Sequence, residues 1–183
     1  MISRITAFVL LILLFPLFCI VSIFIIIDDG LPVYFKQKRI GINNSIFIMY
    51  KFRTMQKNTP NVATHLLKYP ERYMLNIGKV LRKLSLDEVP NLINILRGEM
   101  VFVGPRPALY NQYDLMKLRT SEGVHTLKPG LTGWAQINGR DEISIEEKVK
   151  LDVWYKENYS VILDVKIIFR TLLNSIIGKG ITH

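Results

Sequence analysis

Residues 5–27 read ITAFVLLILLFPLFCIVSIFIII, a run of 23 residues without a charge between Arg4 and the pair Asp28 and Asp29. A straight helix of this length would extend about 35 Å, against a bilayer hydrocarbon core of about 30 Å. No small-x-small cleavage site follows the run before Asp28, which argues against a cleaved signal peptide. The stretch therefore predicts a membrane-embedded helix.

Pro16 lies near the middle of this run and leaves the carbonyl of Ile12 without its helical donor, so a bend is predicted there. Two arms could enter and leave by the same membrane face, as a re-entrant hairpin, or a kinked helix could simply span the bilayer. Pro16 alone favours the kinked spanning helix.

The rest of the chain has the composition of one folded domain with a basic surplus. The 183 residues are 49% hydrophobic and 21% charged, with a formal charge of +9, and all of the Lys and Arg except Arg4 follow residue 30. This surplus predicts that residues 30–183 face anionic lipid on the cytoplasmic side. The single cysteine, Cys19, excludes a disulfide-bonded secreted scaffold.

The patterning predicts an α+β fold that is mainly helical with a small β-hairpin. Strand-forming residues at 33–35 and 46–53 flank a turn over 41–44. A period of two places Lys51 and Arg53 together at the far end of the second strand, either as a functional pair or as an ordinary solvated strand end. Residues 56–70 are polar, contain two prolines and predict a loop.

Helical spacing resumes after this loop. One apolar stripe is predicted to comprise Ile77, Val80, Leu81 and Leu84. The next segment, residues 85–88, matches a capping box with Ser85 as the cap and Glu88 as its partner. Pro90 argues against that box and favours a helix that begins near Asp87 and ends at Gly98. Its buried face is predicted to comprise Val89, Leu92, Ile93 and Leu96. Asp87 and Glu88 would then lie at the positive end of a helix dipole.

Three further segments complete the predicted fold. Two prolines stiffen residues 104–107 around Arg106, which suits either a phosphate or ring contact or an incidental surface turn. Residues 128–133 predict a turn that leads into a short strand over 134–137. Residues 144–156 predict a helix, and residues 161–177 predict an amphipathic helix that either lies in the membrane interface or closes the core.

Several motifs of known enzyme classes are absent from the sequence, and one group of charged residues remains as a candidate site. The sequence has no Cys/His metal spacing, no P-loop, no G-x-S-x-G and no G-x-G-x-x-G, which argues against zinc, acyl-transfer and Rossmann-type enzymes. What remains is the adjacent acidic pair Asp87 and Glu88 together with cations. A carboxylate can attack phosphorus when a divalent cation and Lys or Arg neutralise the phosphate oxygens. The candidate cations are Lys51, Arg53, Arg82 and Arg106.

Four motifs occur in order along the chain: YKFRTM at 50–55, LR at 81–82 with SLDE at 85–88, GEMVFVGPRP at 98–107 and PGLTGWAQINGR at 129–140. Together they resemble the bacterial sugar transferase family, in its small monotopic phosphoglycosyl transferase form. The resemblance implies transfer of a sugar 1-phosphate from a UDP-sugar to polyprenyl (undecaprenyl) phosphate, with release of UMP and a requirement for Mg²⁺. Such a step initiates synthesis of a surface glycan or glycoconjugate, and small members of the family often use N-acetylated amino sugars.

The resemblance also implies roles for individual residues. Asp87 would be the nucleophile that forms a covalent phosphosugar intermediate and would hold Mg²⁺, with Glu88 as its acidic partner. Lys51, Arg53, Arg82 and Arg106 would bind the substrate. Residues 1–29 would form a re-entrant helix broken at Pro16, which reverses the preference drawn from Pro16 alone, although Phe15 stands where the family usually has Ser.

The family further implies that residues 30–183 form a catalytic domain on the cytoplasmic face of the bacterial inner membrane. Its partners would be a UDP-sugar, polyprenyl phosphate and membrane lipid, with no nucleic acid. Two alternative functions remain open from the sequence. One is a membrane-tethered protein that binds anionic lipid or nucleic acid, which the net charge permits. The other is a nucleotide-sugar hydrolase that uses Asp87 with water as the acceptor.

Overall fold

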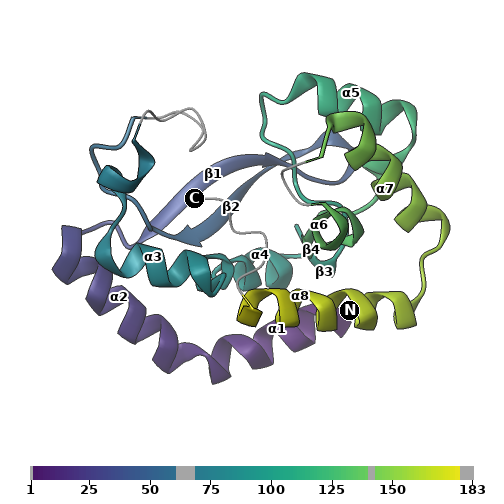
Figure 1. The fold of residues 1–183 in the computed structure, drawn as a ribbon. Coiled ribbons are helices and arrows are strands. Elements are labelled where there is room, and N and C mark those ends of the chain that lie inside the picture. The colour runs from purple at the N-terminus through teal and green to yellow at the C-terminus, as the bar shows by residue number, and fades with distance from the viewer. Residues whose placement is uncertain (1, 61–68, 140–142, 178–183) are drawn as a thin grey trace.

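The computed structural model describes residues 2–60, 69–139 and 143–177, and it is mostly helical with two small two-stranded sheets (Figure 1). The predicted α+β class is thereby confirmed. The predicted loop over 56–70 falls largely on residues 61–68, outside the described part, as does Arg140 at the end of the last motif.

The apolar N-terminal run forms two helices, α1 (Ile2–Leu13) and α2 (Phe15–Asp29), which are bent by 60° relative to each other. The break is at Leu14, and Pro16 lies in the first turn of α2, where a missing N–H costs no helical hydrogen bond. The predicted bend is confirmed. Within the described residues no single helix is long and apolar enough to cross a membrane, whereas this bent pair meets the criterion when its two helices are taken together.

The predicted hairpin is confirmed as β1 (Tyr34–Ile40) and β2 (Ile46–Phe52), which pair antiparallel. Asn43 and Asn44 adopt positive φ in the turn between them, a conformation that Asn tolerates better than most residues. The alternative of a solvated strand end is wrong. The side chain of Arg53 is buried and that of Lys51 is mostly buried, because each forms an ion pair with another element.

A 3₁₀ turn (Pro70–Tyr73) precedes helix α3 (Asn76–Lys83), which carries the predicted apolar stripe. Half of this stripe packs inward: Leu81 is buried, and Ile77 contacts the core formed with α2 and β2. Val80 and Leu84 instead remain about half exposed.

The prediction that a helix begins near Asp87 is wrong. Ser85 has φ of 55°, which separates α3 from a 3₁₀ turn over Leu86–Glu88, and helix α4 (Asn91–Arg97) begins only after Pro90. The capping box was rightly rejected, since the Ser85 side chain makes no capping hydrogen bond. The predicted end of the helix is confirmed, because Gly98 has φ of 82° as its C-cap.

Helix α4 lies between α1 and β2, and this position explains its buried residues. Leu92 and Ile95 pack in one core with Ala7 of α1 and with Phe47 and Met49 of β2. The predicted buried face was therefore only partly right. Contacts on two sides bury Asn91, Leu92, Asn94 and Ile95 and leave Val89, Ile93 and Leu96 half-buried.

The assignments of a turn to 128–133 and a strand to 134–137 are wrong. Strand β3 (Val101–Val103) pairs in parallel with β4 (Gly130–Thr132), and residues 134–138 form the short helix α6 (Trp134–Asn138). A side chain at Gly130 or Gly133 would collide with the backbone of Gly104. The glycines that suggested a turn therefore allow two backbones to approach closely instead.

The remaining helices are α5 (Tyr113–Ser121), α7 (Ile145–Glu157) and α8 (Val161–Ile177), with a 3₁₀ turn at Val124–Thr126. Ser144 and Glu147 form a capping box that fixes the start of α7. Helix α8 buries Ile167, while the apolar side predicted from its spacing points outward. The exposed residues of that side are Ile162, Val165, Ile168, Phe169, Leu172 and Leu173.

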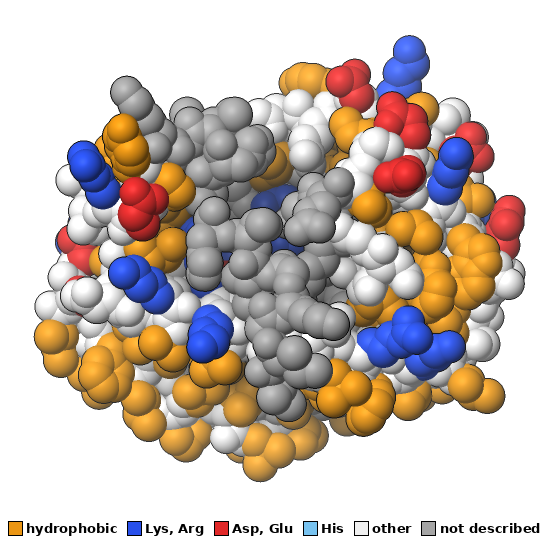
Figure 2. All heavy atoms as spheres, in the orientation of Figure 1, with side chains coloured by type: hydrophobic (Ala, Val, Ile, Leu, Met, Phe, Trp, Pro, Cys, Tyr) orange, Lys and Arg blue, Asp and Glu red, His pale blue; other side chains and the backbone are white. Residues whose placement is uncertain are grey.

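An apolar surface follows from these arrangements. Figure 2 shows hydrophobic side chains gathered along the lower edge of the molecule, where Figure 1 places α1, α2 and α8. We call the exposed apolar side chains of α1, α2 and α8 the apolar face. Its members on α1 and α2 include Ile5, Phe8, Ile12, Phe15, Ile20, Ile23 and Phe24.

Candidate active site

The acidic pair lies where three elements meet. Glu88, in the 3₁₀ turn before α4, accepts a hydrogen bond on Oε1 from Nζ of Lys51 in β2 at 2.7 Å. The same oxygen accepts from Nη2 of Arg106, in the segment after β3, at 3.1 Å. Lys51 and Arg106, which are 55 positions apart in the sequence, are thus brought together at Glu88.

These two cations determine the charge state of Glu88. Burial alone would raise the pKa of its carboxyl, but Arg106 and Lys51 together hold that pKa far below its usual range. Glu88 is therefore ionised at neutral pH and forms a fixed negative charge. It holds the two cations on the same side of the turn.

Asp87 differs from its neighbour. Across the described part of the chain, its carboxylate takes part in no hydrogen bond and no ion pair. Burial raises the pKa of Asp87, as does the charge of Glu88, while Lys51, Arg82 and Arg106 act in the opposite direction. A carboxylate without a bound partner, beside three cations, has the environment expected of a nucleophile or a metal ligand.

Arg82 completes the group from α3. Its Nε donates to Oγ1 of Thr54 at 3.0 Å, which orients the guanidinium. Burial lowers the pKa of Arg82, and the charge of Asp87 opposes this shift, so the two groups lie within electrostatic reach. We call Asp87, Glu88, Lys51, Arg82 and Arg106 the charged cluster.

Arg53 is placed apart from the charged cluster. Its guanidinium donates to the carboxylate of Asp29 and to the carbonyls of Asp29 and Gly30 at the end of α2. Arg53 thereby ties the helix pair to the hairpin. The structure does not bring together Arg53 and the acidic pair that the sequence pattern associated with it.

The residues of the cluster fit a magnesium ion held mainly by substrate. The described residues contain no group of three or more His, Cys, Asp or Glu side chains that could hold a metal. Mg²⁺ commonly binds through one or two carboxylates, several waters and the phosphates of its substrate. The carboxylate of Asp87 accepts no hydrogen bond from the described residues and meets that requirement, whereas Oε1 of Glu88 already accepts from two cations.

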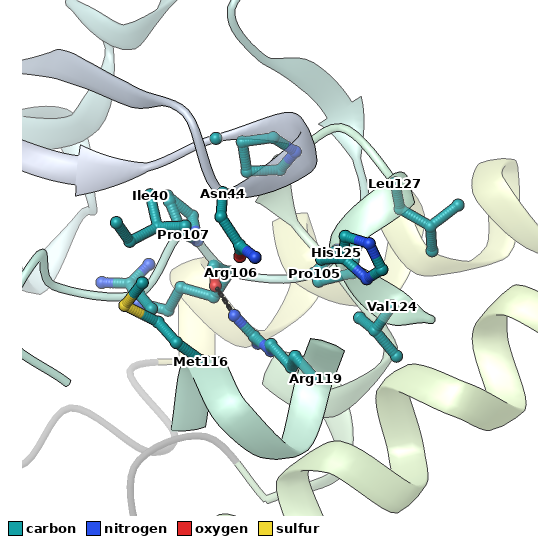
Figure 3. Close-up of a pocket in the computed structure, with 13 residues that line it drawn as sticks. Ile40, Asn44, Pro105, Arg106, Pro107, Met116, Arg119, Val124, His125 and Leu127 are labelled. Atoms are coloured by element: carbon teal, nitrogen blue, oxygen red, sulfur yellow. Dashed lines mark hydrogen bonds between the residues drawn. The ribbon is translucent and has the colours of Figure 1, made fainter. Parts of the chain in front are cut away.

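The structure also shows residues that sequence analysis missed. Arg119 of α5 and Asp152 of α7 form a buried ion pair at 2.6 Å, and Arg119 also donates to the carbonyl of Arg106 at 2.8 Å. Figure 3 shows this contact beside a small pocket. Neither residue lies in a motif, and 33 positions separate them, so no sequence signal joined them.

Comparison with known proteins identifies the family. The model of the bacterial sugar transferase family matches residues 1–178, and the chain belongs to that family. It is accordingly an enzyme, a phosphoglycosyl transferase.

Three relatives illustrate the range of the family. The chain is 45% identical over 154 residues to the uncharacterized sugar transferase EpsL of Bacillus subtilis, covering 83% of this chain and 74% of that protein. It is 40% identical over 187 residues to the undecaprenyl-phosphate glucose phosphotransferase of Komagataeibacter xylinus, and the match covers 96% of this chain and 35% of that protein. It is 34% identical over 171 residues to the UDP-N-acetylgalactosamine-undecaprenyl-phosphate N-acetylgalactosaminephosphotransferase of Aeromonas hydrophila. This match covers 90% of this chain and 40% of that protein.

Proposed function

We propose that this enzyme transfers a sugar 1-phosphate from a UDP-sugar to polyprenyl phosphate, releases UMP and so initiates synthesis of a surface glycan. The observation that carries the proposal is the charged cluster, in which the carboxylate of Asp87 lies beside three cations and has no hydrogen-bond partner among the described residues. Relatives named for sugar phosphate transfer to undecaprenyl phosphate support the same reaction.

The first half-reaction is displacement at the phosphorus that carries the sugar. A carboxylate oxygen of Asp87 forms a bond to this phosphorus, and the bond from phosphorus to the oxygen of the departing UMP breaks. Lys51, Arg82 and Arg106 neutralise the diphosphate oxygens, which would otherwise repel the carboxylate. Glu88 remains ionised and keeps Lys51 and Arg106 in place.

The second half-reaction regenerates the enzyme. An oxygen of polyprenyl phosphate attacks the same phosphorus, the bond to Asp87 breaks, and the lipid-linked diphosphosugar leaves. Mg²⁺ bound by Asp87 and the substrate phosphates would supply additional neutralisation of charge. A hydrolase would differ only in its acceptor, which would be water.

We further propose that the donor carries an N-acetylated amino sugar. The name of the relative from Aeromonas hydrophila supports this choice, while that of the relative from Komagataeibacter xylinus gives glucose as the alternative. A comparison of donors therefore has to include both types of sugar.

The membrane arrangement is part of the same proposal. Residues 1–29 would enter and leave by the cytoplasmic face of the inner membrane as a re-entrant hairpin, with residues 30–183 as the catalytic domain and α8 lying in the interface. The 60° bend between α1 and α2 and the exposed apolar face support this arrangement. The basic surplus after residue 30 supports the cytoplasmic orientation.

The test is UMP release by the purified protein in nanodiscs with Mg²⁺, undecaprenyl phosphate and a panel of UDP-sugars. We expect UMP only when lipid phosphate and an accepted donor are both present. UMP release at an equal rate without lipid phosphate would identify a hydrolase. Binding of anionic lipid or nucleic acid without any turnover would favour the tethered binding protein.

Chelation tests the magnesium proposal separately. EDTA should abolish UMP release and Mg²⁺ should restore it, while the circular dichroism spectrum should stay unchanged, because Lys51 and Arg106 already pair with Glu88 in the cluster. Full activity in EDTA would remove Mg²⁺ from the mechanism.

A further inference from the structure

The backbone of the segment that carries Arg106 is anchored through its carbonyl groups. The carbonyls of residues 105–108 each accept a hydrogen bond from outside the segment, and two of these four residues are prolines, which have no N–H to donate. The donors are the N–H of Gly130 to Pro105, Arg119 to Arg106, Arg39 to Pro107 and the N–H of Ile40 to Ala108, all at 2.8–2.9 Å.

Two of the four donors are side chains, Arg119 and Arg39, and Arg119 is held more firmly than Arg39. The guanidinium of Arg119 donates through Nε and Nη2 to Oδ2 of Asp152 at 2.9 and 2.6 Å, and its Nη1 reaches the carbonyl. Arg119 and Asp152 are 7% and 2% exposed. By contrast, Arg39 is only half-buried and is oriented by Gln37.

Packing of the segment is interrupted on one side, although Pro105, Pro107 and Ala108 are themselves buried. A cavity of about 30 Å³ lies against residues 105–108, and Figure 3 shows Met116, Arg119 and His125 around it. A cavity of this size holds about one water molecule, and the atoms that line it lose packing contacts there. Next to this cavity, the hydrogen bond from Arg119 is a contact that fixes the backbone of Arg106 where packing is incomplete.

We propose that Arg119 and Asp152 are positioning residues for Arg106. Asp152 fixes Arg119, Arg119 fixes the carbonyl of Arg106, and the direction in which the Arg106 side chain leaves the backbone follows from that peptide plane. This direction aims the guanidinium at Glu88 and at the diphosphate of the bound nucleotide sugar. The inference rests on the proposed function, because it assigns Arg106 to that diphosphate.

A purely structural role for the pair would be to clamp α5 to α7. The two roles are separable because a buried ion pair can often be replaced by apolar residues of similar volume with little loss of stability. The variant Arg119→Met/Asp152→Leu keeps that volume, leaves no unpaired buried charge and removes the donor to the Arg106 carbonyl. The matched control is Val149→Ala, which creates a small cavity in the core that Val149 shares with Leu115 and Ala108 but leaves the hydrogen bond from Arg119 to the Arg106 carbonyl in place.

The experiment measures UMP release and, independently, the affinity for UDP by calorimetry. In Arg119→Met/Asp152→Leu we expect KM for the UDP-sugar and Kd for UDP to rise about tenfold, the effect of one hydrogen bond from a charged group, with a smaller change in kcat. Val149→Ala should leave both constants unchanged. Added to Arg106→Ala, the double replacement should have no further effect on either constant, because it acts through Arg106.

Two results would overturn the inference: unchanged constants in the folded variant, or the same tenfold increase when Arg106 is already Ala. If the double variant fails to fold, Arg119→Lys replaces it, because a lysine keeps the charge beside Asp152 but lacks the planar fork of donors that makes all three hydrogen bonds of Arg119, and the same constants decide. Wild-type protein that binds UDP but releases no UMP would contradict the proposed reaction, and UDP affinity would still decide this inference. Wild-type protein without affinity for UDP would overturn both.

Discussion

The charged cluster and the apolar face are opposites in composition and in exposure. The cluster places two carboxylates and three cations largely out of solvent, whereas the apolar face leaves isoleucine, leucine and phenylalanine side chains exposed on three helices. A protein surrounded only by water rarely exposes so large an apolar surface or buries so many charges without a function. The contrast indicates an enzyme that handles a strongly charged group at the edge of an apolar phase.

The four ion pairs in the described residues fall into two groups, those that join secondary-structure elements and those that share one oxygen of Glu88. Arg119 with Asp152 and Arg53 with Asp29 join secondary-structure elements, while Lys51 and Arg106 share one oxygen of Glu88. Only the last arrangement leaves an adjacent carboxylate, Asp87, without a hydrogen bond. Sharing of Glu88 by two cations is therefore what separates the candidate catalytic charges from the structural ones.

The largest expected effect comes from removing the nucleophile in the cluster. Asp87→Asn should lower UMP release by at least about a thousandfold, because an amide cannot form the phosphosugar bond. The thermal unfolding temperature should not fall, because the Asp87 carboxylate makes no hydrogen bond within the described part of the chain and burial raises its pKa. A variant that retains activity would exclude Asp87 as the nucleophile.

A charge placed on the apolar face should cause the next largest effect. Ile12→Lys/Ile23→Lys should shift the protein from membrane to detergent-free supernatant, since a lysine in the hydrocarbon core costs about 2.5–3.5 kcal/mol. Ile46→Lys is the matched control. Ile46 lies at the start of β2 and is 62% exposed, close to the 59% of Ile12, but it is not part of the apolar face.

Membrane partitioning should change in the helix-pair variant and not in Ile46→Lys. Equal partitioning of the two proteins would contradict a membrane role for the apolar face.

Two arginines give the sharpest contrast within the catalytic domain. Arg106→Ala should raise KM for the UDP-sugar about tenfold or more with little change in stability, because its side chain is one-third exposed and faces the cluster. Arg53→Met should do the reverse. It should lower the free energy of unfolding by about 1–3 kcal/mol, since Asp29 loses a nearly buried partner, and leave KM unchanged.

Steady-state kinetics and urea unfolding of both arginine variants check this expectation. If Arg53→Met raised KM as much as Arg106→Ala does, Arg53 would return to the substrate-binding residues predicted from the sequence.

The sequence predicted local features best where one physical signal dominated. The uncharged run with Pro16 predicted a bent helix pair, and alternating strand formers around Asn43 and Asn44 predicted the hairpin, because each signal arises within one element. The end of α4 at Gly98 was equally local. The motifs associated Asp87, Glu88, Lys51, Arg82 and Arg106 with one site through resemblance to the family.

Features that depend on contacts between distant elements were not predictable in the same way. The glycines at 130 and 133 indicated a turn because their need to accommodate Gly104 is invisible in the sequence. The start of α4 was placed too early because Ser85 adopts a positive φ, which is uncommon for serine. Arg53 was associated with the cluster by its strand position, although Asp29 from another element binds it.

The covalent role of Asp87 is tested most directly by the intact mass of the protein after incubation with an accepted UDP-sugar and Mg²⁺ but no lipid phosphate. We expect a mass increase of one sugar phosphate, located on Asp87 and accompanied by about one equivalent of UMP per enzyme. The adduct should disappear when undecaprenyl phosphate is added and should not form in Asp87→Asn. UMP that forms only in the presence of lipid phosphate, with no adduct at any time, would contradict the covalent role of Asp87.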